Sequence, residues 1–117
     1  MKILIAEDDQ TSEEFISIIV QKFAKEIIKA RTGNEAVEAY NKNPDIDLIL
    51  MDIQLPGING YEATMQIRKS DKDVIIIAQT AYGLQGDMEK AIEAGCNDYI
   101  SKPLNKGKLI EIITKHF

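Results

Sequence analysis

The sequence is poor in three features that would each mark a particular class of protein. Cys96 is its only cysteine, which excludes an internal disulfide and leads us to expect a reducing, cytoplasmic location. Basic residues are outnumbered by acidic ones, and the net charge of -5 argues against direct nucleic-acid binding through bulk positive charge. No apolar run is long enough to cross a membrane. These absences favour a globular protein without a membrane segment.

Length and composition fit one folded domain. A chain of 117 residues can form one hydrophobic core but is too short for two. Hydrophobic residues make up 44% and charged residues 28%, as in ordinary globular domains. Because no repeat, low-complexity segment or linker interrupts the sequence, residues 1–117 are predicted to form a single domain.

Apolar segments with strand character alternate with amphipathic segments of helical period. Strands are predicted at residues 2–6, 26–30, 47–52, 74–78 and 98–100. Helices are predicted at about 12–23, 33–42, 61–69, 84–93 and 106–115. Thr11 and Glu14 fit a capping box for the first helix, Asn59-Gly60 opens the third, and Gly95 fits the end of the fourth. The alternation predicts a flavodoxin-like α/β fold, with a parallel sheet in the order 2-1-3-4-5 and helices on both faces.

Polar residues follow the predicted strands where a parallel sheet would bring them together. Asp52 ends an apolar run that suits a central strand. By itself this aspartate could equally be a helix N-cap or an exposed turn residue. Other strands, however, also end in charged or hydroxyl side chains: Glu7, Asp8, Asp9, Thr80 and Lys102. Ligands of such folds bind at the carboxyl ends of the strands, near the switch between strands 1 and 3.

The gathered residue types predict phosphoryl chemistry with a metal ion. Two carboxylates about 4 Å apart repel each other by about 1 to 4 kcal/mol, so stability does not explain the cluster. A hard divalent cation removes the repulsion, and a few carboxylates in a watery shell suit Mg²⁺. An ammonium and a hydroxyl group opposite the metal suit the oxygens of a phosphoryl group.

Five short segments, in order and each at a predicted strand end, carry a resemblance to a known family. They are residues 5–9 (IAEDD), 51–57 (MDIQLPG), 59–60 (NG), 80–81 (TA) and 99–103 (YISKP). The chain resembles the receiver domains of two-component signalling over essentially its whole length. The resemblance implies a signalling switch that accepts a phosphoryl group and is not a turnover enzyme.

The resemblance also implies a role for each residue of the cluster. Asp52 would take the phosphoryl group from a phosphohistidine on a sensor histidine kinase or a histidine phosphotransfer domain. Asp8, Asp52 and the backbone carbonyl of Gln54 would bind Mg²⁺, and Glu7 would reach the metal through water or tune the site. Thr80 and Lys102 would contact phosphoryl oxygens. Asp9 would be a helix-start acid, and a cis peptide bond would precede Pro103.

Further implications concern the lifetime of the phosphoryl group and the output of the domain. Gln54 and Tyr82 occupy positions that influence hydrolysis in the family, and the bulky Tyr82 predicts slow self-hydrolysis. Thr80 and Tyr99 would couple phosphorylation to the face formed by the fourth helix, fifth strand and fifth helix. Without the resemblance, Tyr99 is better interpreted as a half-buried strand aromatic.

The first helix carries apolar residues over a wide arc, from Phe15 to Phe23. One interpretation is a helix packed deeply between its neighbours. The other is that part of this face, around Phe15 and Ile19, docks a histidine-bearing helical partner beside Asp52.

Other functions remain open at this point. A flavin-binding module shares the architecture, but three acids stand where its phosphate loop would be. A Mg²⁺-dependent aspartyl-phosphate phosphatase shares the chemistry but needs a substrate pocket. A receiver-like binding module that is no longer phosphorylated is a third alternative. The chain could be a stand-alone regulator or a receiver from a hybrid kinase with fused effector or kinase domains. Its sequence resembles the receivers of hybrid kinases slightly more closely.

Overall fold

The computed structural model describes residues 1–81 and 85–117 and places five parallel strands in one sheet, ordered β2-β1-β3-β4-β5. The strands are β1 (Lys2–Ala6), β2 (Glu26–Ala30), β3 (Leu48–Asp52), β4 (Ile75–Thr80) and β5 (Asp98–Ser101). The helices are α1 (Gln10–Val20), α2 (Gly33–Lys42), α3 (Gly60–Arg68), α4 (Gln85–Ala94) and α5 (Lys106–His116). The predicted fold class and strand order are therefore confirmed.

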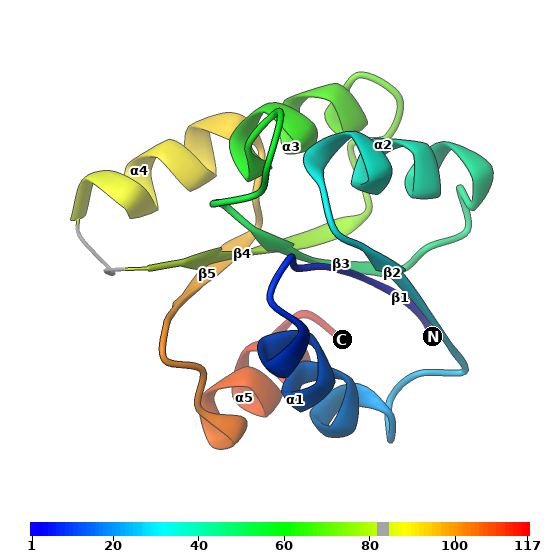
Figure 1. The fold of residues 1–117 in the computed structure, drawn as a ribbon, viewed down its shortest axis with the longest axis vertical. Coiled ribbons are helices and arrows are strands. Elements are labelled where there is room, and N and C mark those ends of the chain that lie inside the picture. Colours follow the sequence, from blue (N-terminus) through cyan, green and yellow to red (C-terminus); the bar gives the residue numbers. More distant parts are fainter. Residues whose placement is uncertain (82–84) are drawn as a thin grey trace.

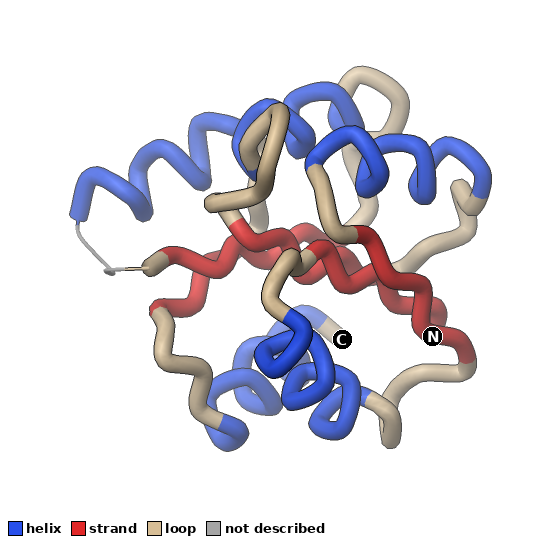
Figure 2. The backbone as a smooth tube through the Cα atoms, in the orientation of Figure 1, coloured by secondary structure: helices blue, strands red, loops and turns tan. Residues whose placement is uncertain are grey.

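The helices form two layers, with α2, α3 and α4 on one face of the sheet and α1 and α5 on the other (Figure 1, Figure 2). Successive strand residues point to opposite faces. Leu4, Ile49 and Ile76 accordingly pack in the core beneath α2, α3 and α4. Ile3, Leu48 and Ile77 pack in the second core against α1 and α5. This alternation assigns each residue at a strand end to one of the two faces.

The first helix begins earlier and ends earlier than predicted. Asp9 is its N-cap, because its carboxylate accepts a hydrogen bond of 2.8 Å from the backbone N–H of Ser12. The predicted capping box of Thr11 and Glu14 is wrong, since Thr11 already lies inside the helix and Glu14 accepts a bond from the Gln10 side chain. The helix ends at Val20 rather than Phe23. The interpretation of Asp9 as a helix-start acid is confirmed.

Other boundaries follow the local signals more closely. Asn59 and Glu62 form a complete capping box at the start of α3, where the Asn59-Gly60 pair predicted that a helix opens. Gly95 has a φ of 114° at the end of α4, a conformation that favours glycine. Strand β4 continues to Thr80, past the predicted end at residue 78, because Gln79 and Thr80 still pair with neighbouring strands. The predicted start of the fourth helix at residue 84 lies outside the described residues.

Candidate functional site

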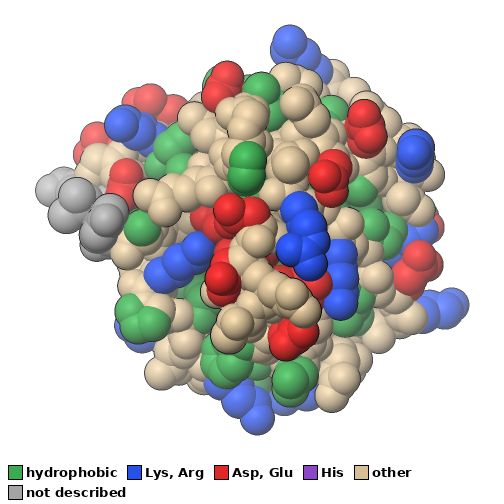
Figure 3. Space-filling view, viewed as in Figure 1, with side chains coloured by type: hydrophobic (Ala, Val, Ile, Leu, Met, Phe, Trp, Pro, Cys, Tyr) green, Lys and Arg blue, Asp and Glu red, His purple; other side chains and the backbone are tan. Residues whose placement is uncertain are grey.

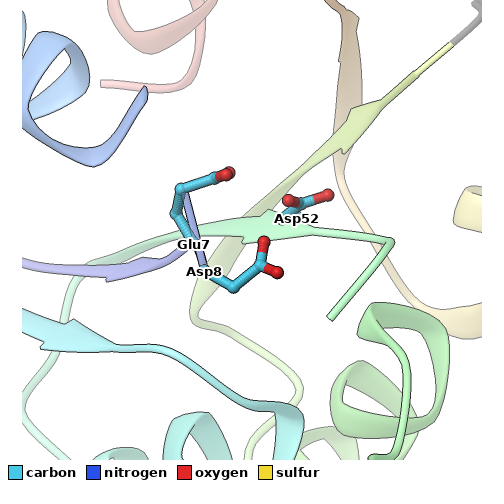
Figure 4. Close-up of side chains that lie close together, drawn as sticks. All are labelled: Glu7, Asp8 and Asp52. Atoms are coloured by element: carbon cyan, nitrogen blue, oxygen red, sulfur yellow. The ribbon is translucent and has the colours of Figure 1, made fainter. Parts of the chain in front are cut away.

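The carboxyl ends of β1, β3, β4 and β5 bring the predicted residues together at one edge of the sheet. Glu7 and Asp8 follow β1, Asp52 ends β3, Thr80 ends β4 and Lys102 follows β5. Figure 4 shows Glu7, Asp8 and Asp52 around this edge, and each offers a carboxylate oxygen within 4.8 Å of the others. Glu7 and Asp52 are buried, whereas Asp8 is exposed.

Asp52 is held in place by bonds to both carboxylate oxygens. Oδ1 accepts a hydrogen bond of 3.0 Å from the backbone N–H of Gln54, and Oδ2 accepts one of 2.9 Å from Nζ of Lys102. Its backbone also requires a glycine nearby, because a Cβ at Gly60 would lie 2.3 Å from the Asp52 carbonyl oxygen. The loop after β3 can therefore return close to the strand end only with glycine at the start of α3.

Lys102 reaches two acids, one at the end of β3 and one just after β1. Its ammonium lies 2.9 Å from Oδ2 of Asp52 and 3.5 Å from Oε2 of Glu7. Its backbone N–H donates a hydrogen bond of 2.8 Å to the carbonyl of Thr80, and the Lys102–Pro103 peptide bond is cis, as expected. Since β4 lies between β5 and β3, the Lys102 side chain crosses β4 to reach Asp52.

The electrostatics reflect three acids and one cation in a largely buried place. Burial, together with the neighbouring Asp52 and against the opposing effect of Lys102, raises the pKa of Glu7 to about 7. Burial disfavours the Lys102 ammonium, but its contacts with Asp52 and Glu7 prevail and raise the pKa of Lys102. Lys102 is thus a permanent cation at neutral pH, and Glu7 is poised to bind or release a proton.

Unpaired buried oxygens give a direct test of whether a metal ion and a phosphoryl group fit the site. Within the described part of the chain, Oε2 of Glu7 and Oγ1 of Thr80 are buried without a hydrogen-bond partner. The carboxylates are hard oxygen ligands of the kind that Mg²⁺ prefers, and a hydroxyl group can donate to a phosphoryl oxygen. The residues present therefore fit both groups.

The side chains of Gln54 and Tyr99 lie outside the cluster around Asp52, and Tyr82 lies outside the described residues. The Gln54 side chain is exposed, and only its backbone takes part in the geometry around Asp52. Tyr99 is half-buried and packs against the core beneath α2, α3 and α4. Tyr82, to which slow self-hydrolysis was attributed, belongs to residues 82–84, outside the described residues.

The sequence-based interpretation gave no role to Gln79, which is buried beside Asp52. Its Cα pairs with that of Asp52 across β3 and β4, and its side chain is only 1% exposed. Gln79 lies two residues after Ile77 and therefore points to the same face of the sheet. A polar residue there interrupts the apolar pattern of that face, and this interruption was a usable signal in the sequence.

Acidic side chains gather at the centre of the molecular surface over this edge, with Lys and Arg side chains on either side (Figure 3). Next to them, α1 and the segment after β5 enclose a hollow of about 290 Å³, with the lining residues Thr11, Ser12, Phe15, Lys102, Pro103 and Leu104. Phe15 is 42% exposed and Ile18 is 66% exposed. The prediction that Ile19 forms part of a docking face is wrong, because Ile19 is buried in the core.

Comparison with known proteins identifies the family of this arrangement. The family model for the response regulator receiver domain matches residues 3–114. A hybrid signal transduction histidine kinase I from Dictyostelium discoideum is 40% identical over 96% of this chain, which spans 7% of that protein's length. The polar-differentiation response regulator DivK of Brucella anthropi is 34% identical over 97% of this chain and 94% of its own length.

Solved structures agree with the sequence matches. The receiver domain of yeast Ssk1, crystallised with the histidine phosphotransfer protein Ypd1, superposes with a TM-score of 0.90 at 35% identity, covering 98% of this chain and 87% of that chain. The receiver domain of the sensor histidine kinase PA1611 from Pseudomonas aeruginosa superposes with a TM-score of 0.86 at 35% identity, covering 97% and 94%. That structure carries a magnesium ion coordinated in its active-site cleft. In residues 1–81 and 85–117 of the present chain, no helix has the length and apolarity needed to cross a bilayer.

Proposed function

The chain belongs to the family of response regulator receiver domains, phosphoacceptors of two-component signalling, and we propose that Asp52 is the residue that accepts its phosphoryl group. The observation that carries this assignment is the position of Asp52: it is the buried carboxylate that contacts Lys102 at 2.9 Å and shares the acidic cluster with Glu7 and Asp8. A buried acid with a cation on one oxygen is oriented for use as a nucleophile.

The transfer requires an Asp52 oxygen to attack the phosphorus of a phosphohistidine. The new O–P bond forms as the P–N bond breaks, and the imidazole leaves with the electron pair of that bond. The N–H of Gln54 fixes Oδ1, while Lys102 moves its contact from the carboxylate to a phosphoryl oxygen. Thr80, whose buried hydroxyl is otherwise without a partner among the described residues, donates to a second phosphoryl oxygen.

We assign the metal site to Asp8, Asp52 and the backbone carbonyl of Gln54, with Glu7 contributing directly or through water. Mg²⁺ bound there would offset the repulsion between the carboxylates and the incoming phosphoryl group. The three carboxylates with oxygens within 4.8 Å support this, as does the magnesium ion in the similar PA1611 receiver.

Thr80 and Tyr99 are proposed to carry the signal away from the site. Thr80 ends β4, and Tyr99 lies on β5 with its Cα paired to Ala78, two residues before Thr80. A phosphoryl group that draws the Thr80 hydroxyl towards Asp52 would favour one position of Tyr99 over another. Phosphorylation should then shift the ring signals of Tyr99 in NMR spectra, and unshifted signals would reject the coupling.

The donor is proposed to be a sensor histidine kinase or a histidine phosphotransfer protein that docks over α1. The exposed Phe15 and Ile18 and the hollow beside Lys102 provide an apolar surface next to Asp52. The complex of the similar Ssk1 receiver with Ypd1 supports a partner of this class. Since the only product is the acyl phosphate on its own Asp52, the domain acts as a switch and not as a turnover enzyme.

Intact mass spectrometry after incubation with acetyl phosphate tests the assignment of Asp52. The wild type should gain about 80 Da, the mass of one phosphoryl group, only when Mg²⁺ is present. Asp52→Asn should gain nothing, because the amide is not a nucleophile of this kind. Asp73→Asn, which changes an exposed aspartate elsewhere, should behave as the wild type does. Labelling of Asp52→Asn at the wild-type level would reject Asp52 as the acceptor.

A further inference from the structure

One buried polar side chain beside the site has no part in the phosphoryl transfer described above. Gln79 is 1% exposed, and among residues 1–81 and 85–117 neither its Oε1 nor its Nε2 has a hydrogen-bond partner. A buried amide without partners costs stability that an apolar side chain of similar size would not cost. Its presence therefore calls for a function.

The register of the sheet places Gln79 in line with the acids of the site. Ala6 pairs with Met51, so that Glu7 follows β1 at the level of Asp52, and Asp52 pairs in turn with Gln79 on β4. Glu7, Asp52 and Gln79 share the face of Ile5, Leu50 and Ile77, on which α1 and α5 pack. Three buried polar residues thus form one row across three neighbouring strands.

Lys102 reaches this row from β5, the strand that pairs with β4 at Gln79. Gln79 pairs with Ile100 on β5, and Lys102 follows Ile100 by two residues on the same face. The Lys102 ammonium nevertheless contacts Asp52 on β3 and Glu7 beyond β1, at 2.9 Å and 3.5 Å. Because β4 separates β5 from β3, the lysine side chain extends across the face from which Gln79 projects.

We propose that Gln79 is a positioning residue of the phosphorylation site, whose carboxamide oxygen is joined to a free N–H of the Lys102 ammonium through one water, since the two groups make no direct hydrogen bond in this structure. An ammonium has three donors, of which one bonds Oδ2 of Asp52, while Oε2 of Glu7 lies 3.5 Å away as an ion-pair partner. An additional acceptor on β4 keeps the ammonium aimed at Asp52. This inference rests on the proposed function of Asp52 and Lys102.

The decisive variant is Gln79→Met, which keeps the length of the side chain and removes its polar atoms. We expect the melting temperature to stay level or rise, because the buried Nε2 group, which has no partner among the described residues, is removed. The rate of Mg²⁺-dependent phosphorylation by acetyl phosphate should fall about tenfold, because Lys102 is less well aimed. Gln79→Leu should show the same two changes if the fold tolerates its branched shape.

Ile77→Val is the matched control, since Ile77 lies two residues earlier on the same strand and face. It should lower the melting temperature and leave the phosphorylation rate within about twofold of wild type. A positioning role would be supported if Gln79→Met slows phosphorylation without lowering the melting temperature, while Ile77→Val lowers the melting temperature without slowing phosphorylation. A Gln79→Met variant that is phosphorylated as fast as wild type would overturn it.

A second measurement separates this inference from the proposed function. In the metal-free, unphosphorylated protein, the Gln79 side-chain NH₂ signals in ¹H–¹⁵N NMR spectra can be assigned by their loss in Gln79→Met. They should shift in Lys102→Met if the ammonium contacts the carboxamide, and unshifted signals would overturn the inference. Failure of the wild type to take up a phosphoryl group would instead reject the proposed function and leave this contact test valid.

Discussion

At the residue scale, Glu7 is a buried acid of the site whose pKa is shifted to near neutrality. Its pKa rises from 4.5 to about 7 because it is buried next to Asp52. The folded state therefore holds a proton that the unfolded chain releases between those two pH values. In that interval the folded state binds more protons, so the free energy of unfolding falls as the pH rises.

We expect Glu7→Gln to remove this dependence, because the amide resembles the protonated acid and carries no charge. With EDTA present, we expect the free energy of unfolding of the wild type to fall between pH 5 and pH 8 relative to that of the variant. The difference should reach up to about 3 kcal/mol, as measured by urea unfolding. Glu38→Gln, at an exposed position on α2, should follow the wild-type curve. Parallel curves for Glu7→Gln and wild type would show that Glu7 is ionised in the folded state throughout.

At the scale of elements, Arg68 connects the ends of two helices to the sheet at the edge opposite the site. From the end of α3 it donates bonds of 2.8 Å to the carbonyl of Gly95, just after α4, and 2.8 Å to Oδ1 of Asn97. A third bond, of 3.2 Å, reaches the carbonyl of Asp71. Oδ1 of Asn97 also accepts the N–H of Ile76, so the network includes β4.

Arg68→Ala should lower the free energy of unfolding by about 2 kcal/mol, because three acceptors lose a charged donor. Urea unfolding measures this loss, and Lys69→Ala, at the exposed neighbouring position, should change it by much less. Phosphorylation of Asp52 by acetyl phosphate should remain at the wild-type rate, since the network lies at the far edge of the sheet. A slower rate in Arg68→Ala would mean that the two edges are coupled.

At the scale of the whole molecule, the two faces of the sheet expose different apolar residues. Phe15 and Ile18 are exposed on α1, whereas Met65 on α3 and Ile92 on α4 are exposed on the opposite face. If a partner docks over α1, a charge there should impede phosphoryl transfer from a protein and spare transfer from a small molecule.

Phe15→Glu and Ile18→Glu should therefore slow transfer from a phosphorylated histidine phosphotransfer domain about tenfold or more, which corresponds to about 1.4 kcal/mol. Their reaction with acetyl phosphate should be nearly unchanged. Ile92→Glu is the control on the other face and should affect neither donor. Transfer rates followed on Phos-tag gels give the comparison, and equal slowing with both donors would place the effect in the site and not in docking.

The sequence was sufficient for the fold and for most of the site. Periodicity and the order of the segments gave five strands, five helices and the sheet order, because apolar alternation and right-handed crossovers leave few arrangements. The positions of Glu7, Asp8, Asp52, Thr80 and Lys102 followed from the rule that strand ends meet at one edge. Local signals were less sufficient at α1, where Asp9 and not Thr11 caps the helix.

What depended on the tertiary structure was the relation between side chains on different strands. The sequence determined that Asp52, Glu7 and Lys102 come near one another, but only the packed sheet decided that Lys102 bridges both acids. It also decided that Ile19 is buried while Phe15 and Ile18 are exposed, and that Gln79 joins the acidic row. The physical reason is that distances, burial and register between strands arise from packing over long sequence separations, which local propensity does not encode.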